Sequence, residues 1–194
     1  MKLFYTKRSP YARKVRVLAL EKGITLDLIN EDLAKKSKVL LDSNPLGKVP
    51  TLILDNGDTI YDSVVICQYL DELNDTPVLI PKSGKARYEV LKWEAMADDL
   101  VTMAISVYME KIRHPDHPHE QFIQNTENTI RKAYEHVETR LPELKEFSLA
   151  PIAIASAIGY IQFRLPQVAM RSKLTEWFTE FSKRPSMAQT IPVV

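Results

Sequence analysis

The chain has 194 residues, of which 45% are hydrophobic and 26% are charged, and its formal net charge at pH 7 is +1. This length is enough for one large domain or two small ones, with a hydrophobic core that needs no disulfide. The balance of 26 Lys and Arg against 25 Asp and Glu excludes the basic surface with which proteins bind nucleic acid or acidic membranes. We therefore expect small or neutral partners, with no nucleic acid and no membrane among them.

The single cysteine, Cys67, excludes an internal disulfide and fits a reducing compartment. We expect it to be a buried structural thiol. Residues 1–8 carry charges where a signal peptide needs its apolar centre. No apolar run approaches the ~20 residues of a membrane span. The sequence therefore predicts a cytoplasmic protein.

The first 75 residues are predicted to alternate between strands and helices. Short apolar runs predict four strands, at residues 3–6, 24–28, 51–54 and 59–61. Apolar residues at helical spacing predict three helices, at residues 12–22, 34–43 and 63–73. The Asn56-Gly57 pair between the last two strands is a strong hairpin signal. A crossover between parallel strands followed by an antiparallel pair predicts a mixed four-stranded sheet covered by helices.

Residues 76–84 contain two prolines and a glycine without periodicity, which predicts a linker. Beyond it we expect four helices, at residues 85–112, 119–144, 148–163 and 173–183, and an extended tail over 184–194. The third of these helices is apolar on almost all sides and should be the buried centre of its domain. The expected organisation is thus an α/β domain at 1–75, a linker at 76–84 and an all-α bundle domain at 85–194.

Ser9 lies where the first predicted strand meets the first predicted helix. Pro10 suits the first helical turn, because its missing N–H costs nothing there, and this puts Ser9 at or beside the N-cap. Exposed amides and the positive end of the helix dipole make such a site attractive to an anion. Serine is also a preferred N-cap residue, so capping alone could explain its presence.

The segment Ser9-Pro10-Tyr11-Ala12-Arg13-Lys14-Val15-Arg16 resembles the S-P-[FY]-x-R-K-V-R motif of small bacterial members of the glutathione S-transferase family. Other segments match the family in order and spacing along the whole chain, at residues 44–52, 61–71, 154–160 and 184–186. The resemblance implies a thioredoxin-like first domain, glutathione as co-substrate and a homodimer. The reaction that it implies is conjugation of glutathione to an electrophilic small molecule, as in detoxification.

On this resemblance, the Ser9 hydroxyl would donate a hydrogen bond to the sulfur of glutathione. Since the thiolate is the nucleophile, the thiol must ionise before it attacks. A charged hydrogen bond and a helix N-terminus could together lower the thiol pKa from about 8.5 by roughly one to three units. No His or acid in the motif could take the Ser9 proton, so Ser9 is not expected to be a nucleophile. Redox members of the superfamily have Cys at this position, so we do not expect disulfide exchange.

Two further segments are candidates for holding the tripeptide. Val49-Pro50 could be a rigid loop with a trans bond, since only about 5–6% of X–Pro bonds are cis. The resemblance instead implies a cis bond, with the Val49 backbone paired to the cysteinyl part of glutathione and Lys48 reaching a carboxylate. Asp62 and Ser63 could merely cap the helix that begins there. The resemblance implies that Ser63 and nearby amides receive the γ-glutamyl carboxylate, while Asp62 stands where many relatives have Glu.

Tyr11 and Tyr108 are the candidates for the electrophile pocket, although Tyr108 could instead pack in the helical core. The histidines of residues 114–119 are interrupted by two prolines, and we expect no metal site there. At Ser148, the family's S/T-x-x-D cap lacks its acid, because Pro151 stands in the fourth position. This should affect local stability more than activity.

Two alternatives to a transferase are compatible with the same residues. One is a non-catalytic interaction protein that keeps the fold of the family. The other is a glutathione-dependent peroxidase, isomerase or lyase, which would share the tripeptide site and differ only in its second pocket. The second substrate cannot be read from the sequence, because apolar side chains from distant helices define it.

Overall fold

The computed structural model describes residues 1–193, and their contacts divide the chain into two compact units. The first unit comprises Met1–Arg87 together with Pro185–Val194, and the second comprises Tyr88–Arg184. The C-terminal segment therefore groups with the first unit, whereas the sequence placed it with the helical domain. The boundaries expected at residues 75 and 85 stay predictions. Within the part of the chain that the structure describes, no helix is both long and apolar enough to cross a membrane.

The first unit is built on a mixed four-stranded sheet, as predicted. Its strands are β1 (Lys2–Tyr5), β2 (Asp27–Asn30), β3 (Thr51–Ile53) and β4 (Thr59–Ile60), in the order β2-β1-β3-β4. The β1 strand pairs with β2 in parallel and with β3 antiparallel, and β3 and β4 form an antiparallel hairpin. This topology is the crossover followed by a hairpin that the pattern of strands and helices predicts.

The second strand lies further along the chain than predicted. Residues 24–28 alternate, but the Ile24 N–H is held by the Ala19 carbonyl at 2.8 Å, in the turn that ends the preceding helix. Gly23 there has φ of +66°, a conformation that L side chains rarely adopt. The strand begins only at Asp27, whose N–H bonds to the Met1 carbonyl at 3.0 Å. The predicted strand at 24–28 is therefore wrong in its bounds, because the helix-terminating turn uses its first residues.

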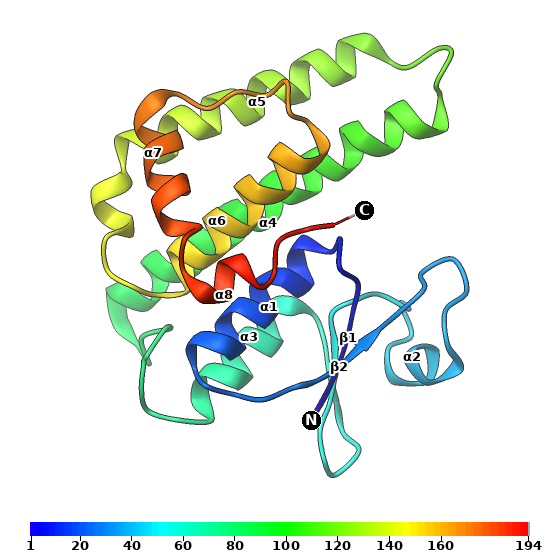
Figure 1. Cartoon of the computed structure of the whole chain (residues 1–194), viewed down its shortest axis with the longest axis vertical. Coiled ribbons are helices and arrows are strands. Elements are labelled where there is room, and N and C mark those ends of the chain that lie inside the picture. The colour runs from blue at the N-terminus through cyan, green and yellow to red at the C-terminus, as the bar shows by residue number, and fades with distance from the viewer. Residues whose placement is uncertain (194) are drawn as a thin grey trace. The chain divides into compact units, whose positions relative to one another are not determined.

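The helices of the first unit are α1 (Pro10–Glu21), α2 (Lys38–Ser43), α3 (Ser63–Glu72) and α8 (Pro185–Ala188). The predicted helix at 34–43 is shortened to α2 because Ser37 caps it, accepting from the Leu40 N–H at 3.2 Å. In place of the expected extended tail, the chain forms α8, which lies against α1 (Figure 1). Arg13 on α1 donates from Nη2 to the Met187 carbonyl at 3.2 Å. That contact connects residues far apart in sequence.

The core of the first unit lies between the sheet and the neighbouring helices α1 and α3 (Figure 1). Its fully buried side chains come from all of these elements and include Leu3, Val15, Leu18, Leu52, Ile66 and Leu70. Cys67 is also fully buried, as the sequence predicts. Burial of this apolar surface stabilises the arrangement of strand ends and helix starts on which the candidate site depends.

The second unit is helical. Its elements are α4 (Gly84–Arg113), α5 (Glu120–Thr139), a short 3₁₀ helix (Leu141–Leu144), α6 (Leu149–Arg164) and α7 (Ser172–Phe181). The loop 114–119 joins α4 to α5, and the two helices lie side by side (Figure 1), where Lys111 donates to Glu127 at 3.3 Å. The predicted helix at 119–144 divides before Pro142, because proline cannot continue the α-helical hydrogen bonds.

The α6 helix is the buried centre of this unit, as predicted. All but four of its residues are buried, which agrees with a sequence that is apolar on almost every side. Ser148 is its N-cap and accepts from the Ala150 N–H at 3.3 Å. Pro151, in place of the family's acid, is itself buried in the first turn. Proline is tolerated there because the first N–H groups of a helix have no intrahelical partner.

Candidate functional site

The strand register brings three of the predicted site segments to one edge of the sheet. Thr51, the first residue of β3, lies opposite Phe4, near the end of β1. Ile60, the last residue of β4, lies opposite Leu52, near the start of β3. The end of β1, the start of β3 and the end of β4 therefore share an edge. The segments that contain Ser9, Val49-Pro50 and Asp62-Ser63 follow or precede these strand ends directly.

Ser9 is the N-cap of α1, and Pro10 occupies the first helical turn, both as predicted. Its backbone N–H is held by the Thr6 side chain at 3.1 Å and the Thr6 carbonyl at 3.2 Å. Its Oγ accepts from the Ala12 N–H at 3.2 Å. Within residues 1–193 the hydroxyl hydrogen of Ser9 has no acceptor. The half-buried hydroxyl is therefore oriented by its accepted bond and remains able to donate.

The Val49–Pro50 peptide bond is cis, as the resemblance implies. Pro50 is buried and Val49 is half-buried immediately before β3. The Val49 N–H and C=O make no backbone hydrogen bond to any residue that the structure describes. This leaves one donor and one acceptor at the strand edge for an extended ligand.

Two buried residues that were not predicted as site residues position this segment. The Asn44 side-chain amide donates to the Lys48 carbonyl at 3.2 Å and to Thr51 Oγ1 at 3.0 Å. Thr51 Oγ1 in turn donates to the same Lys48 carbonyl at 2.8 Å. Both side chains are almost completely buried. Both residues lie in the family-like segment 44–52, but nothing in that segment indicated these hydrogen bonds beyond a turn at Asn44-Pro45.

Asp62 and Ser63 form the start of α3. Asp62 is the exposed N-cap and accepts from the Val64 N–H at 3.1 Å. Ser63 is buried, and its hydroxyl makes no hydrogen bond within the described chain. The capping function thus belongs to Asp62, which leaves the Ser63 hydroxyl and the first amides of a ten-residue helix for an anion. Lys48 is exposed, and its ammonium forms no ion pair with residues 1–193.

The positive charges of α1 have structural partners. Arg13 is almost completely buried, and burial, followed by the charge of Arg16, lowers the pKa of its guanidinium to about 10. The Arg16 guanidinium lies 4.7 Å from the centre of the Tyr5 ring, and burial lowers its pKa as well. These side chains fix α1 against its own unit.

The two predicted electrophile-pocket residues lie in different units, and each is half-buried. Tyr11 is in the first turn of α1, two residues from Ser9. Tyr108 lies on α4 of the second unit, and its hydroxyl accepts from Arg164 Nη1 at 3.0 Å. Tyr108 is not among the buried core residues. Nothing in the sequence indicated Arg164, because the two residues are 56 positions apart.

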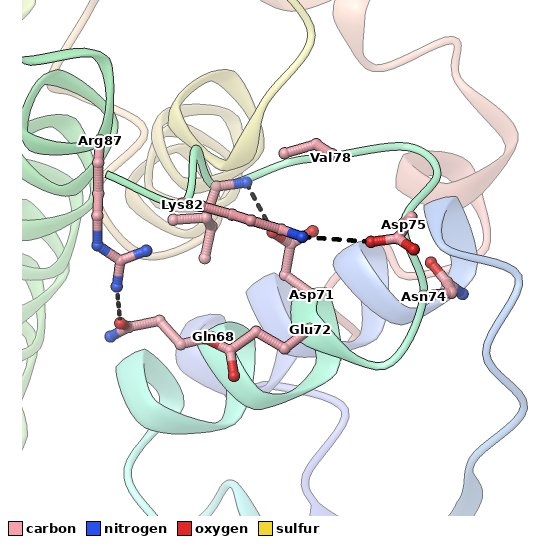
Figure 2. A pocket seen from close by; sticks show the side chains of 9 residues that line it. Gln68, Asp71, Glu72, Asn74, Asp75, Val78, Lys82 and Arg87 are labelled. Atoms are coloured by element: carbon pink, nitrogen blue, oxygen red, sulfur yellow. Dashed lines mark hydrogen bonds and ion pairs between the residues drawn. The ribbon is translucent and has the colours of Figure 1, made fainter. Parts of the chain in front are cut away.

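A separate pocket of about 400 Å³ lies at the C-terminal end of α3, remote from Ser63 (Figure 2). Arg87 donates there to the Gln68 side chain, and Lys82 pairs with Asp75 at 3.4 Å. None of the predicted site residues lines it. Among residues 1–193, no group of three or more His, Cys, Asp and Glu is placed to hold a metal ion.

The chain has two parts. The first is a mixed four-stranded sheet with helices, which is a thioredoxin-like domain, and the second is a helical region. Residues 3–78 match the family model described as the glutathione S-transferase N-terminal domain. Over 199 aligned positions the chain is 33% identical to the GST-like protein YibF of Escherichia coli strain K12, covering 99% of this chain and 98% of that protein. The chain therefore belongs to the glutathione S-transferase family.

Solved structures agree with this assignment over the whole chain. A glutathione transferase family member from Pseudomonas fluorescens Pf-5, with bound glutathione, has 37% sequence identity and a TM-score of 0.89, and the match covers 100% of this chain and 99% of the other. A second structure of that protein contains S-(propanoic acid)-glutathione and matches equally well. These matches confirm the predicted fold class.

Proposed function

We propose that the protein is a glutathione transferase that ionises the thiol of bound glutathione beside Ser9 and directs it at an electrophilic small molecule. The observation that supports this most is the state of the Ser9 hydroxyl. Its oxygen is held by the Ala12 N–H, while its hydrogen has no acceptor within residues 1–193. A fixed donor at the start of a helix stabilises a thiolate more than a thiol.

The chemical step needs no protein nucleophile. The thiol loses its proton to solvent, and the thiolate sulfur forms a bond to an electrophilic carbon. In a substitution, a leaving group departs with the electron pair of its bond to that carbon. In an addition to a double bond, the π electron pair moves to the neighbouring carbon, which then takes up a proton. The contribution of Ser9 is a hydrogen bond to the charged sulfur, which is worth about 1.5–3 kcal/mol, or one to two pKa units.

The rest of the tripeptide would lie along the sheet edge. The free N–H and C=O of Val49, which precedes the cis Pro50, suit the backbone of the cysteinyl residue. The unpaired Ser63 hydroxyl and the amides at the start of α3 suit the γ-glutamyl carboxylate, with Asp62 as the cap. Lys48 would reach the other carboxylate, since its exposed ammonium has no acidic partner in the described chain.

Tyr11 and Tyr108 are the proposed contacts of the electrophile. Both rings are half-buried, which leaves part of each side chain for a ligand. The Pseudomonas relative binds a glutathione whose sulfur carries a propanoic acid group, which supports a small sulfur substituent as the product in this family.

We also propose that the protein is a cytoplasmic homodimer with a role in detoxification. Three large apolar side chains along α3 and its flanks are between 38% and 49% exposed, namely Tyr61, Val65 and Leu73. Val65 lies within α3, Leu73 is its C-cap residue, and Tyr61 precedes the N-cap residue Asp62. A second copy of the chain could cover these exposed apolar side chains, and sedimentation of the wild-type protein and of Val65→Asp tests this: the variant should be monomeric.

Calorimetric titration with glutathione, followed by assays on a panel of aryl halides, unsaturated acids and hydroperoxides, tests the proposed function. A transferase binds glutathione and turns over electrophiles. Binding of glutathione without any turnover would identify a non-catalytic interaction protein. Turnover of hydroperoxides or isomerisable substrates alone would identify a glutathione-dependent peroxidase, isomerase or lyase. Absence of glutathione binding would contradict the proposal altogether.

A further inference from the structure

A pocket of about 340 Å³ lies beside the C-terminal half of α1. Its walls come from α1, the turn at Gly23 that follows this helix, the edge strand β2, and Gln189 just after α8. All of these residues belong to the first unit. The described residues that line it include none of the predicted site residues, so this pocket is separate from the proposed glutathione site.

The lining of this pocket is mostly aliphatic, and its apolar side chains are those of Ala19, Leu20, Ile24, Leu26 and Leu28. Leu20 and Leu28 are 43% and 41% exposed, so a ligand in the pocket would remove apolar surface from water. A cavity of this volume holds about ten non-hydrogen atoms, at about 30 Å³ for each water-sized group. A small amphipathic molecule of that size suits a mostly apolar pocket with few polar groups.

Arg16 supplies the charge among the described residues that line the pocket, and it is half-buried. Ala19 and Leu20 follow it by three and four residues, a spacing that puts all three on one face of α1. The Arg16 guanidinium carbon lies 4.7 Å from the centre of the Tyr5 ring, which restricts the plane of the guanidinium. A fixed cation and an aliphatic wall therefore belong to the same pocket.

The Arg16 guanidinium has no acceptor in the described chain. Its Nε is buried without a partner, and no hydrogen bond or ion pair joins its side chain to residues 1–193. Burial lowers the pKa of Arg16, which means that its surroundings oppose the positive charge. A buried N–H without an acceptor is costly, and so is a partly buried charge without a counter-ion.

Two neighbouring cations of the first unit are treated differently. Lys22 Nζ lies 3.1 Å from Oδ1 of the buried Asp71. Arg13 Nη2 donates to the Met187 carbonyl at 3.2 Å. The fold thus supplies acceptors to these two side chains, whereas Arg16 receives only the face of an aromatic ring. An anion from outside the described chain would provide the acceptor that Arg16 lacks.

We propose that this pocket binds an aliphatic monocarboxylate of about eight carbons, with its carboxylate on Arg16 and its chain along the aliphatic wall. A guanidinium favours a planar acceptor with two oxygens, and one cation matches the single charge of a carboxylate. The seven residues from Arg16 to Gly23 span about 10 Å along the helix axis, which is comparable with an extended eight-carbon chain. This inference does not depend on the proposed function, because the two sites share no residue.

Calorimetric titration of the full chain with three probes tests the proposal. Octanoate has both the charge and the chain, octan-1-ol lacks the charge, and acetate lacks the chain. Octanoate should bind about tenfold or more tightly than octan-1-ol, as expected for one charge-assisted pair. Acetate should bind too weakly to detect, since it buries almost no apolar surface. Excess S-hexylglutathione, which would occupy the site of the proposed function, should leave octanoate binding unchanged.

Variants of two lining residues locate the binding. Arg16→Gln should reduce the affinity for octanoate to that for octan-1-ol. Leu20→Asp changes an exposed position, where the fold should tolerate it, and puts a carboxylate one helical turn from Arg16. It should abolish octanoate binding, because Arg16 then has an internal counter-ion. Arg113→Gln is the matched control: it removes the charge of an exposed arginine outside the pocket and should leave octanoate binding intact.

The outcomes separate this pocket from the glutathione site. Equal affinities for octanoate and octan-1-ol, or no binding of octanoate, would overturn the inference while leaving the proposed function standing. Loss of octanoate binding on addition of S-hexylglutathione would overturn it too, because the acid would then occupy the other site. Equal octanoate affinity in Leu20→Asp and wild type would have the same consequence. Failure to bind glutathione would contradict the proposed function alone.

Discussion

Lys22 and Asp71 form an ion pair in the interior of the first unit, with Nζ 3.1 Å from Oδ1 and side-chain exposures of 0% and 7%. Lys22 Nζ also donates at 2.8 Å to three backbone carbonyls, those of Asp71, Asn74 and Pro77. The Asp71 carboxylate accepts at 2.9 Å from two backbone amides, those of Leu79 and Ile80. One pair of side chains therefore connects the ends of α1 and α3 to residues 77–80.

Replacing Asp71 by Ala should destabilise the protein strongly. The change leaves a buried ammonium without its counter-ion and two buried amides without an acceptor. Breaking a buried pair on one side costs about 3–5 kcal/mol. The free energy of unfolding, measured by urea denaturation, should fall by that amount.

Asp75→Ala is the control for Asp71→Ala. Asp75 pairs with Lys82 at 3.4 Å, but both side chains are more than 80% exposed. An exposed pair contributes about 0–1 kcal/mol. Similar unfolding free energies for the two variants would show that the buried network does not stabilise the fold.

Asn44→Ala should weaken glutathione binding although Asn44 is not a proposed contact. The variant loses the bonds to the Lys48 carbonyl and to Thr51 Oγ1, which hold the segment that presents Val49. The Thr51 hydroxyl still donates to the Lys48 carbonyl, so each lost hydrogen bond should cost about 0.5–1.5 kcal/mol, part of which should appear as lost affinity. Calorimetry with glutathione measures the loss.

Asn56→Ala provides the comparison for Asn44→Ala. Asn56 is exposed in the β3–β4 turn, and among residues 1–193 its side chain bonds only to Asp58, two positions further on. Its replacement should leave glutathione affinity unchanged. If Asn44→Ala lowered stability with no effect on affinity, the positioning role of Asn44 would be excluded.

Glu127 should make the stability of the protein depend on pH in the acid range. Burial alone would raise the pKa of its carboxyl, but hydrogen bonds from Gln167, Lys111 and Arg131 and the charge of Lys111 hold the pKa below 4.5. A carboxyl whose pKa is lower in the folded state stabilises the fold above its unfolded pKa. This contribution is lost as the pH falls through the folded value.

Glu127→Gln should therefore cost about 1–2 kcal/mol at neutral pH, the value of a charged hydrogen bond in a partly screened site. The difference from wild type should shrink as the pH falls through the lowered pKa of the folded-state carboxyl. Urea denaturation across this range measures it. If the difference in unfolding free energy between wild type and Glu127→Gln did not depend on pH, the lowered pKa of the Glu127 carboxyl would be contradicted.

Features set by neighbouring residues could be predicted from the sequence, and features set by distant contacts could not. The cap at Ser9, the Asn-Gly hairpin and the buried α6 each follow from a few adjacent residues. The start of β2 was mispredicted because a turn after Gly23 overrides the alternation. The packing of residues 185–190 on α1 depends on Arg13, and the Arg164–Tyr108 contact joins two helices. Neither leaves a periodic signal in the sequence.

The pKa of the thiol of bound glutathione tests the central claim most directly, and it can be followed by the ultraviolet absorbance of the thiolate as pH is varied. With the wild-type protein the pKa should lie below the free value of about 8.5. Ser9→Ala should raise it by about one to two units, since one charged hydrogen bond is lost, and should raise the activation free energy of turnover by about 2 kcal/mol or less. Ser9→Thr, which keeps both the hydroxyl and a capping side chain, should retain most of the shift. The same thiol pKa in Ser9→Ala and wild type, with glutathione bound to both, would contradict the proposed role of Ser9.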